Sequence, residues 1–449
     1  MRSKKLLVVT LVLLALGVLS LAFLTACGEE ETTTTTAAPP SSATTAPPSS
    51  GTTVPGGTET TGAAEMGEDL VIGVINSMTG VNALTGAEQK WAQEKAAADQ
   101  NAKGGIKLAD GKMHKVVLKF YDDKSSDTEA AAAMEKAIKS DGIKILLSSN
   151  TTPYNQAAAT VAEQYQAYYH INTSWIDEAS PDGSFPGFIG GMNLKWASDI
   201  FESAAESGKV AVGGAKAMTE PISKFAVLTE NNPDGVGFGD STKARLEAEG
   251  WQVVAYEKFV EGQKDFSSII LKFKNAGVEG IVTLISPADG ITFVKQLKEQ
   301  GWAPKYMFGY KGFWPVEFMK ALGPDSDYIC FDGFWTETYP YPYAKELGQA
   351  FRDEHNGNSS VSVGLPYAAA QILFMAIERA GVFEPGPVRD EVFGGFFPGT
   401  TMGDIQYNEE GIAHIPFLAF QWIGGERVVL YPEQFATGKT QTFKPWDQR

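Results

Sequence analysis

Short apolar runs rich in β-branched residues alternate with longer amphipathic stretches through most of this chain. The first series of predicted strands covers residues 70–75, 116–121, 143–147 and 168–171. Predicted helices lie between them at 91–102 and 128–140, and another begins near Pro153, since proline suits a first helical turn. This alternation is typical of a parallel sheet covered by helices on both faces.

The same rhythm returns in a second series further along the chain. Its predicted strands are 225–229, 252–259, 280–284 and 306–308, and its predicted helices are 241–249, 266–276 and 291–300. A helix over 365–379 and strand-like runs at 417–422 and 428–431 follow. The fold class is therefore α/β, with two similar Rossmann-like lobes. Between the two series, residues 193–223 hold a helix and a Gly/Ala-rich piece that we interpret as an extra surface segment.

The N-terminal region has a different pattern, typical of a lipoprotein leader. Residues 1–5 are basic, 6–23 are almost wholly apolar, and Leu24-Thr25-Ala26-Cys27 follows at once. We interpret 1–26 as a signal peptide and Cys27 as the lipidated first residue of the mature protein. An uncleaved membrane-spanning helix is the alternative, and the cysteine at this offset favours the lipoprotein.

A low-complexity stretch follows the predicted lipidation site. Residues 27–67 consist mainly of Thr, Ala, Pro, Ser, Gly and Glu, a composition that cannot bury a core. We expect a disordered tether that holds the folded part near a membrane, on the extracytoplasmic face. In composition the spacer resembles those of Gram-positive lipoproteins, and a Gram-negative host stays open as the alternative.

Charge and cysteine content limit the partners. The net charge of -17 becomes -20 once Arg2, Lys4 and Lys5 leave with the signal peptide, which disfavours nucleic acid and anionic lipid surfaces. Membrane attachment is then by lipid. After lipidation of Cys27 a single cysteine, Cys330, remains, so no intramolecular disulfide forms, and its apolar neighbours predict a buried strand residue.

Several segments together resemble one known family. They are Ile72-Gly73-Val74, Thr79-Gly80, Gly86, Asn101-Ala102-Lys103-Gly104-Gly105-Ile106, Tyr121-Asp122-Asp123, Asp265-Phe266, Ala376-Ile377-Glu378-Arg379-Ala380-Gly381 and Phe420-Gln421-Trp422. Their order and spacing over about residues 70–431 resemble the leucine/isoleucine/valine-binding family of ABC-transporter solute receptors.

The resemblance implies a type I periplasmic-binding fold, whose two lobes are joined by three hinge crossovers. We place these near Met192, Trp335 and Thr401, which gives lobe 1 as 68–192 plus 336–400 and lobe 2 as 193–335 plus 401–449. It further implies a monomeric receptor without cofactor or metal that closes on one small molecule and delivers it to ABC permease subunits. A sensor that docks to a signalling protein is the alternative.

The resemblance also carries site residues in the first lobe. Ser148, Ser149, Asn150 and Thr151 match the hydroxyl-rich loop that holds a ligand carboxylate in amino-acid-binding relatives, and hydroxyls beside a helix N-terminus suit an anion. The alternative is that these residues only cap the next helix. Ser174 and Trp175 correspond to the second loop of this lobe, where Trp175 is unusually large and is expected to line the pocket.

The second lobe departs from the family pattern. Asp234 stands where amino-acid-binding relatives have a tyrosine, and Lys311, after Tyr310, stands where they have the acidic partner of the ligand ammonium. Facing cations cost free energy in a desolvated cleft. Either Asp234 takes the ammonium, or the ligand offers Lys311 an anionic or carbonyl group, with an aromatic body favoured by the nearby rings; a Lys311 that points to solvent is the third alternative.

Catalytic chemistry finds little support in this sequence. There is no G-x-S-x-G motif, and the histidines at 114, 170, 355 and 414 are widely separated without metal-ligand spacing. The Gly235-x-Gly237-x-Gly239 run is a weak imitation of a dinucleotide turn, and we interpret it as plain turn chemistry. We therefore expect a binding protein and not an enzyme.

Overall fold

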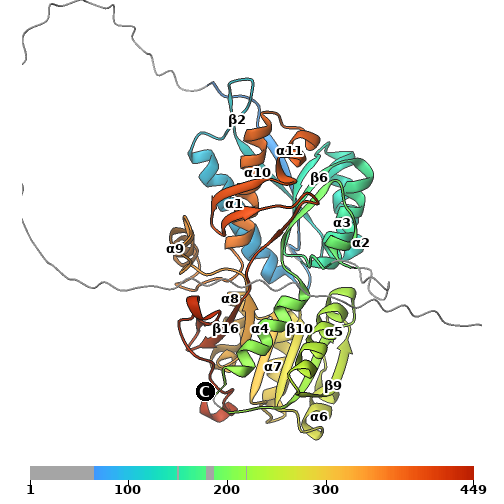
Figure 1. Ribbon diagram of the computed structural model, residues 1–449, viewed down its shortest axis with the longest axis vertical. Coiled ribbons are helices and arrows are strands. Elements are labelled where there is room, and N and C mark those ends of the chain that lie inside the picture. Colours follow the sequence, from blue (N-terminus) through green and yellow to red (C-terminus); the bar gives the residue numbers. More distant parts are fainter. Residues whose placement is uncertain (1–64, 149–150, 178–186, 219) are drawn as a thin grey trace, which may run out of the picture. The chain divides into compact units, whose positions relative to one another are not determined.

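The computed structural model describes residues 65–148, 151–177, 187–218 and 220–449. The predicted signal peptide, Cys27 and nearly all of the predicted tether lie outside these residues, as do Ser149 and Asn150. Within the described part, no helix is both long and apolar enough to cross a membrane. Its strands form two large sheets and two small ones (Figure 1).

The first large sheet has six strands in the order β15-β7-β6-β5-β1-β4, and neighbouring strands run parallel. They are β1 (Leu70–Asn76), β4 (Val116–Asp122), β5 (Ile145–Leu147), β6 (Tyr168–Asn172), β7 (Ala197–Phe201) and β15 (Ile412–His414). Alanine-rich faces of α2 (Asp127–Glu135) and α3 (Thr152–Tyr165) pack on one side of the sheet. The other side is covered by α1 (Ala83–Ala102), α10 (Gly364–Ala380) and α11 (Pro385–Val392).

The second large sheet has seven strands in the order β17-β16-β12-β11-β10-β8-β9. They are β8 (Lys224–Glu230), β9 (Gln252–Phe259), β10 (Gly280–Ile285), β11 (Tyr306–Lys311), β12 (Cys330–Gly333), β16 (Leu418–Ile423) and β17 (Glu426–Tyr431). The first five run parallel, and β16 and β17 add an antiparallel edge. The helices of this lobe are α4 (Ala204–Lys216), α5 (Pro233–Ala248), α6 (Ser267–Asn275), α7 (Pro287–Glu299) and α8 (Val316–Leu322).

The remaining elements are short. Two antiparallel pairs join β2 (Ile106–Lys107) to β3 (Met113–His114) and β13 (Phe396–Thr400) to β14 (Gly403–Gln406). Helix α9 (Ala344–Glu354) packs on α1 through Phe351, whose ring centroid lies 5.0 Å from that of Trp91. A π-helical turn covers Lys136–Ser140, and 3-10 turns cover Ile189–Gly191, Gly323–Ser326, Glu433–Phe435 and Trp446–Gln448.

This architecture confirms the predicted fold class and the strands of both series. The beginnings of two helices differ, because α1 starts at Ala83 and α5 starts at Pro233, inside the segment interpreted as a turn. A Cβ atom on Gly235 would lie 2.1 Å from the carbonyl oxygen of Glu230. Glycine here therefore serves the close approach of α5 to the end of β8, and not a turn.

The chain changes sheets three times. It passes from β7 to α4 after Phe201, from β12 towards α9 after Gly333, and from β15 to β16 after His414. The first and third changes come later than the positions near Met192 and Thr401 expected from the sequence. The reason is that each of these crossings is preceded by a further short strand, β7 or β15, which pairs within the first sheet before the chain passes to the second sheet.

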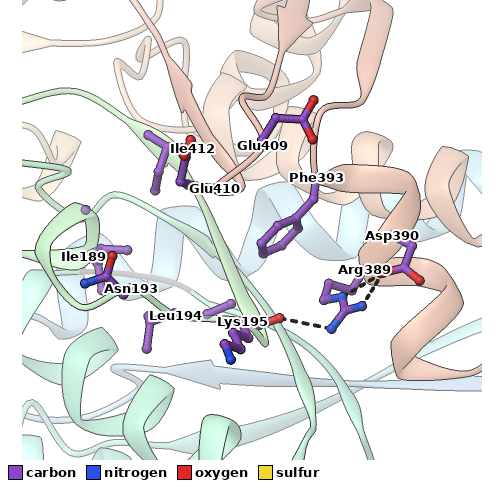
Figure 2. A pocket seen from close by; sticks show the side chains of 12 residues that line it. Ile189, Asn193, Leu194, Lys195, Arg389, Asp390, Phe393, Glu409, Glu410 and Ile412 are labelled. Carbon is purple, nitrogen blue, oxygen red and sulfur yellow. Dashed lines mark hydrogen bonds and ion pairs between the residues drawn. The ribbon is translucent and has the colours of Figure 1, made fainter.

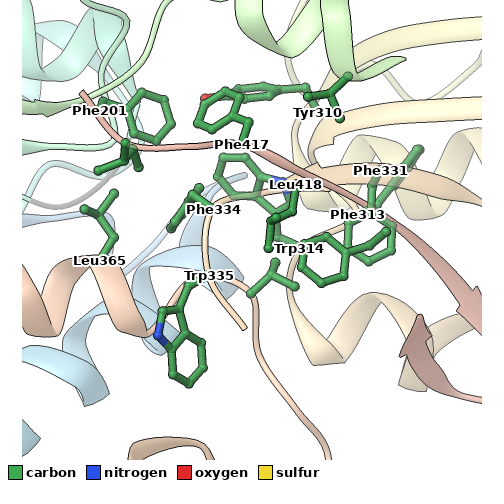
Figure 3. Packing of buried hydrophobic residues seen from close by; sticks show 14 of the residues in the cluster. Phe201, Tyr310, Phe313, Trp314, Phe331, Phe334, Trp335, Leu365, Phe417 and Leu418 are labelled. Carbon is green, nitrogen blue, oxygen red and sulfur yellow. The ribbon is translucent and has the colours of Figure 1, made fainter. Parts of the chain in front are cut away.

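An aromatic cluster holds the three crossing segments together (Figure 3). Phe201, Phe334 and Phe417 come one from each segment, with ring centroids 5.5 Å apart for Phe201–Phe334 and 5.1 Å apart for Phe201–Phe417. All three rings are buried. Edge-to-face packing of this kind adds to the free energy of burial, so the hinge of the molecule is a packed core and not a loose linker.

The segment interpreted as a surface insertion belongs to the core. Helix α4 packs along α5, β12 and β16, and Val210, Ala211 and Val212 are buried. Its small residues permit that approach, because a Cβ on Gly214 would lie 2.6 Å from the hydroxyl oxygen of Tyr306, which donates to the carbonyl of Ala211 at 2.8 Å. The Gly/Ala composition therefore reflects close helix-to-sheet packing.

Two neighbouring glycines of α4 test this packing. Gly214→Ala should lower the free energy of unfolding by about 1–3 kcal/mol because the new methyl collides with Tyr306. Gly213→Ala places its Cβ 3.8 Å from Tyr431, an ordinary contact, and should leave stability unchanged or raise it by up to about 1 kcal/mol. Urea unfolding of both variants measures the difference, and equal effects would contradict the packing of α4.

Candidate functional site

The candidate site lies where the carboxyl ends of the strands in the two large sheets face one another. Loops that follow β5 and β6 and the first turn of α1 provide its first-lobe side, and the ends of β8 and β11 provide its second-lobe side. The lobes touch here, because the Thr151 hydroxyl donates to Asp234 Oδ2 at 3.0 Å. This is the edge at which parallel α/β sheets bind ligands.

A small chamber is enclosed at this contact. Its cavity volume is about 10 Å³, room for about one water molecule, and it is lined by Asn82, Thr85, Thr151, Thr173, Tyr310, Lys311 and Trp314. Drug-sized ligands occupy pockets of roughly 300–1,000 Å³, so an organic ligand needs a more open arrangement of these residues than the one in this structure. None of these described lining residues is acidic, and Lys311 supplies their one full charge.

Lys311 is buried with an ion-pair network around its ammonium group. Its Nζ donates to Glu230 Oε2 at 2.8 Å and to Asp234 Oδ2 at 3.5 Å, and it lies 4.0 Å from Glu261 Oε1. A further hydrogen bond of 3.5 Å goes to Thr151 Oγ1 in the first lobe. Lys311 is only 4% exposed. The alternative that its side chain points to solvent therefore does not describe this structure.

The charged groups in this network shift one another's pKa values. Burial lowers the pKa of Lys311, but the negative charges of Glu230, Asp234 and Glu261 outweigh burial and raise it, so the group stays an ammonium ion. Burial raises the pKa of Glu230 to about 8, assisted by the charge of Glu261 and opposed by Lys311. The second lobe therefore presents one permanent cation backed by the carboxyl groups of Glu230, Asp234 and Glu261.

Aromatic rings form the apolar side of the site. Tyr310 stacks against Trp175 with centroids 4.5 Å apart, and meets Trp314 edge-on at 4.8 Å. Trp314 is fixed by a hydrogen bond of 3.0 Å from its Nε1 to Asp332 Oδ1. The sequence analysis expected Trp175 to line the pocket, but Trp175 is not among the residues that line the chamber. It lies behind Tyr310 and joins it to Phe201 of the crossing segments.

Two predicted ligand contacts of the first lobe have structural partners instead. The Ser148 hydroxyl donates to the carbonyl of Asn172 at 3.2 Å and accepts from its backbone N–H at 2.8 Å, so it joins the ends of β5 and β6. Ser174 Oγ accepts from Asn155 Nδ2 at 2.7 Å. Thr151, by contrast, does line the chamber, and its side chain does not cap α3.

Several residues of the site were missed by the sequence analysis. Asn82 and Thr85 belong to the first turn of α1, and Glu230 ends a buried strand. The signal was present for Glu230, because an acidic residue directly after an apolar strand seldom stays buried without a partner. Thr85 Oγ1 has no hydrogen-bond partner among the described residues although it is buried, so its hydroxyl is free to bond to a group in the chamber.

A different hollow lies at the first lobe, away from this chamber (Figure 2). It opens beside the beginnings of β7 and β15, and Arg389 there is already bonded to Asp390 and, at 3.4 Å, to the carbonyl of Lys195. Its charged groups are thus paired or exposed. Across the described ranges, no group of three or more His, Cys, Asp or Glu residues could hold a metal ion.

Comparison with known proteins gives consistent matches. Residues 69–425 match the family model described as periplasmic binding protein. The Leu/Ile/Val-binding protein homolog 3 of Brucella melitensis is 27% identical over 366 residues, 81% of this chain and 94% of that protein. Among solved structures, LivJ of Streptococcus pneumoniae in complex with isoleucine has a TM-score of 0.67 and 20% identity, covering 81% of this chain and 100% of that one.

A second solved structure is a solute-binding protein of an ABC transporter from R. palustris in complex with benzoate. It has a TM-score of 0.69 and 16% identity, covering 84% of this chain and 98% of that chain. At these identities both structures show a shared fold and no more. Proteins of this fold were therefore solved with an amino acid and with an acid that has no ammonium group.

The Lys311–Glu230 pair predicts a stability effect. Lys311→Met should reduce the free energy of unfolding at pH 8 by about 3 kcal/mol, because it leaves the buried Glu230 carboxylate without its cation. Adding Glu230→Gln removes the orphaned charge and should recover much of the loss. Lys320→Met, at an exposed ion pair with Glu317, should cost less than about 1 kcal/mol. Chemical denaturation of the three variants measures these differences, and a Lys311→Met variant as stable as the control would refute the buried pair.

Proposed function

This chain belongs to the periplasmic binding protein family, and from that membership we propose that it is a lipid-anchored, extracytoplasmic receptor for a small organic acid or carbonyl compound. The family match confirms the resemblance inferred from the sequence, and proteins of this family bind solutes without catalysing a reaction. The receptor acts as a monomer and hands its ligand to the permease subunits of an ABC importer.

The polar groups in the chamber wall are the observation that supports this class of ligand. The wall combines the Lys311 ammonium with the hydroxyl of Thr85, which has no partner within the described chain. The hydroxyls of Thr151 and Thr173 also line the chamber, but they already donate to Asp234 and Asn172. The acidic groups stand behind Lys311 and do not line the chamber. An ammonium and hydroxyl groups are donors for a carboxylate or a carbonyl oxygen. A ligand ammonium next to Lys311 would meet like charge in a desolvated space, which costs free energy.

The apolar side of the chamber determines what kind of non-polar group a ligand can place there. Tyr310 and Trp314 offer ring surfaces, and a flat or aromatic ligand of modest size packs against such rings. Relatives are named as Leu/Ile/Val-binding proteins, and one protein of the same fold was solved with benzoate. Among these two ligand classes, the position of Lys311 favours the acid that lacks an ammonium group.

A ligand panel with two threonine variants tests this proposal. In calorimetry, benzoate should bind the full-length protein more tightly than isoleucine or leucine. Thr85→Val should weaken benzoate binding about tenfold, because a hydrogen bond to a charged group is worth about 1.5–3 kcal/mol. Thr242→Val is the matched control, since Thr242 is also buried with a hydroxyl unpartnered in the described chain but lies on α5 outside the chamber.

The outcomes separate the ligand classes. Unchanged benzoate affinity in Thr85→Val, together with normal folding, would remove the chamber as the binding site. Tight isoleucine binding without benzoate binding would overturn the acid and support an amino acid whose ammonium is taken by Asp234. Binding raises the thermal midpoint by mass action, so a thermal-shift series gives an independent readout.

The lipid anchor has its own test. Cys27→Ser removes the only thiol at the predicted cleavage site, so the protein should fail to be lipidated and should be released from the membrane or remain unprocessed. Cys330→Ala is the control, because Cys330 is buried in β12 and should have no part in anchoring. Metabolic labelling with a fatty acid and membrane fractionation measure both. A labelled, membrane-bound Cys27→Ser protein would refute the anchor.

A further inference from the structure

The hydroxyl group of Ser286 contacts two carboxyl groups, although it has only one hydrogen to donate. Its Oγ lies 2.5 Å from Glu230 Oε1 and 2.9 Å from Glu261 Oε1. A hydroxyl has one hydrogen to donate, so it can serve only one of two ionised carboxylates at these distances. A hydrogen on one of the carboxyl groups, donated to Ser286 Oγ, would satisfy the second contact. The geometry therefore provides a place for one proton between Glu230 and Glu261.

The charge count around Lys311 agrees with this proton. Asp234, Glu230 and Glu261 all approach one ammonium within 4.0 Å, so the fully ionised cluster has two negative charges in excess. The groups that face it from the neighbouring elements are Tyr154 of α3, which donates to Glu261 Oε1 at 3.4 Å, and Asp289 of α7, which accepts from the Gly262 N–H at 2.7 Å. Neither adds a positive charge.

One proton reduces this excess from two negative charges to one. Burial, with the charge of Glu261, raises the pKa of Glu230 to about 8, so this carboxyl group titrates in the range where cells and assays operate. Glu230 also competes with any ligand, because its Oε2 occupies the Lys311 ammonium at 2.8 Å. The state of this one carboxyl thus controls how much positive charge Lys311 presents to the chamber.

We infer that the receptor takes up a proton together with its acidic ligand, with Glu230 and Glu261 sharing the proton across Ser286. This inference rests on the proposed function, since it requires an anionic ligand at Lys311. The anion binds as such, and the proton comes from solvent. When Glu230 is protonated it donates to Ser286, and the charge of Lys311 is available to the ligand carboxylate.

The direction of the pH dependence follows from this linkage. A bound anion disfavours the ionised form of the cluster, so the proton is held more tightly in the complex than in the free protein. Affinity for an acid is then highest below the titration of the free cluster and falls as the pH rises through it. A ligand with an ammonium group at the same place would show the opposite sign, with proton release on binding.

Calorimetry with benzoate measures both quantities on the full-length protein. Titrations at pH 8 in Hepes and in Tris, which differ in ionisation enthalpy, give the number of protons taken up per benzoate, expected at about one half. Affinity should fall about tenfold between pH 7 and pH 9. Benzamide, the uncharged analogue, should bind without proton uptake.

Glutamine variants show which carboxyl group takes up the proton. Glu230→Gln keeps an N–H that donates to Ser286 and removes the titration, so benzoate affinity should become independent of pH and the uptake should vanish. Glu261→Gln, at a partly exposed position, removes the charge that assists burial in raising the pKa of Glu230, so the fall in affinity should move to lower pH; it provides a second readout if Glu230→Gln does not fold. Glu247→Gln on the exposed surface of α5 is the matched control and should retain the uptake.

The results distinguish this inference from the proposed function. Benzoate binding without proton uptake, or with uptake that survives in Glu230→Gln, overturns the coupling and leaves the acid receptor standing. Failure of benzoate and the other acids to bind overturns both. Proton uptake that disappears in Glu230→Gln, or a fall in affinity that moves to lower pH in Glu261→Gln, establishes the coupling when Glu247→Gln behaves as the unaltered protein does.

Discussion

A buried ammonium ion needs compensation, and Lys311 imposes that requirement on the whole site. Taking such a charge out of water costs several kcal/mol unless ion pairs and hydrogen bonds replace the lost hydration. Here the compensation comes from the end of β8 and the first turn of α5, with Thr151 contributing from the other lobe. The backbone of Lys311 has φ 49°, a left-handed conformation that is costly without glycine and aims the side chain at these partners. One charge therefore fixes the relative positions of several strand ends.

The chamber and the hinge are parts of one continuous aromatic core. Tyr310 faces the chamber, stacks on Trp175 behind it, and Trp175 contacts Phe201 at 5.6 Å in the cluster of the crossing segments. Close-packed interiors do not deform continuously, so a rotation of one lobe must move these rings between discrete arrangements. A ligand that packs on Tyr310 therefore acts directly on the residues about which the lobes turn, without a separate transmitting element.

The sequence predicted what depends on periodicity and on strand ends. The strands of both series are present, and the loop that follows β5 and the last two residues of β11 bring Thr151, Tyr310 and Lys311 to the chamber. The roles of Ser148 and Trp175 could not be predicted, because they depend on which backbone group or ring lies opposite in three dimensions. Helix α4 was misinterpreted for a related reason: a Gly/Ala-rich helix has the same composition whether it is exposed or packed closely on a sheet, and only the position of Tyr306 distinguishes them.

The departure from the family pattern at Lys311 gains a physical meaning from these contacts. The resemblance to amino-acid-binding relatives led us to expect an acidic residue at this position, as the partner of a ligand ammonium. Here the chain supplies an ammonium of its own, which joins Glu230 of one lobe to Thr151 of the other. Contacts between the lobes thus no longer need a ligand amino group. The ligand has to favour the closed state by different means, because only differential binding shifts a population. Under the proposed function, Thr85 Oγ1 would be such a means, because it is buried and unpartnered within the described chain, and a ligand acceptor placed against it would gain a hydrogen bond inside the enclosed chamber.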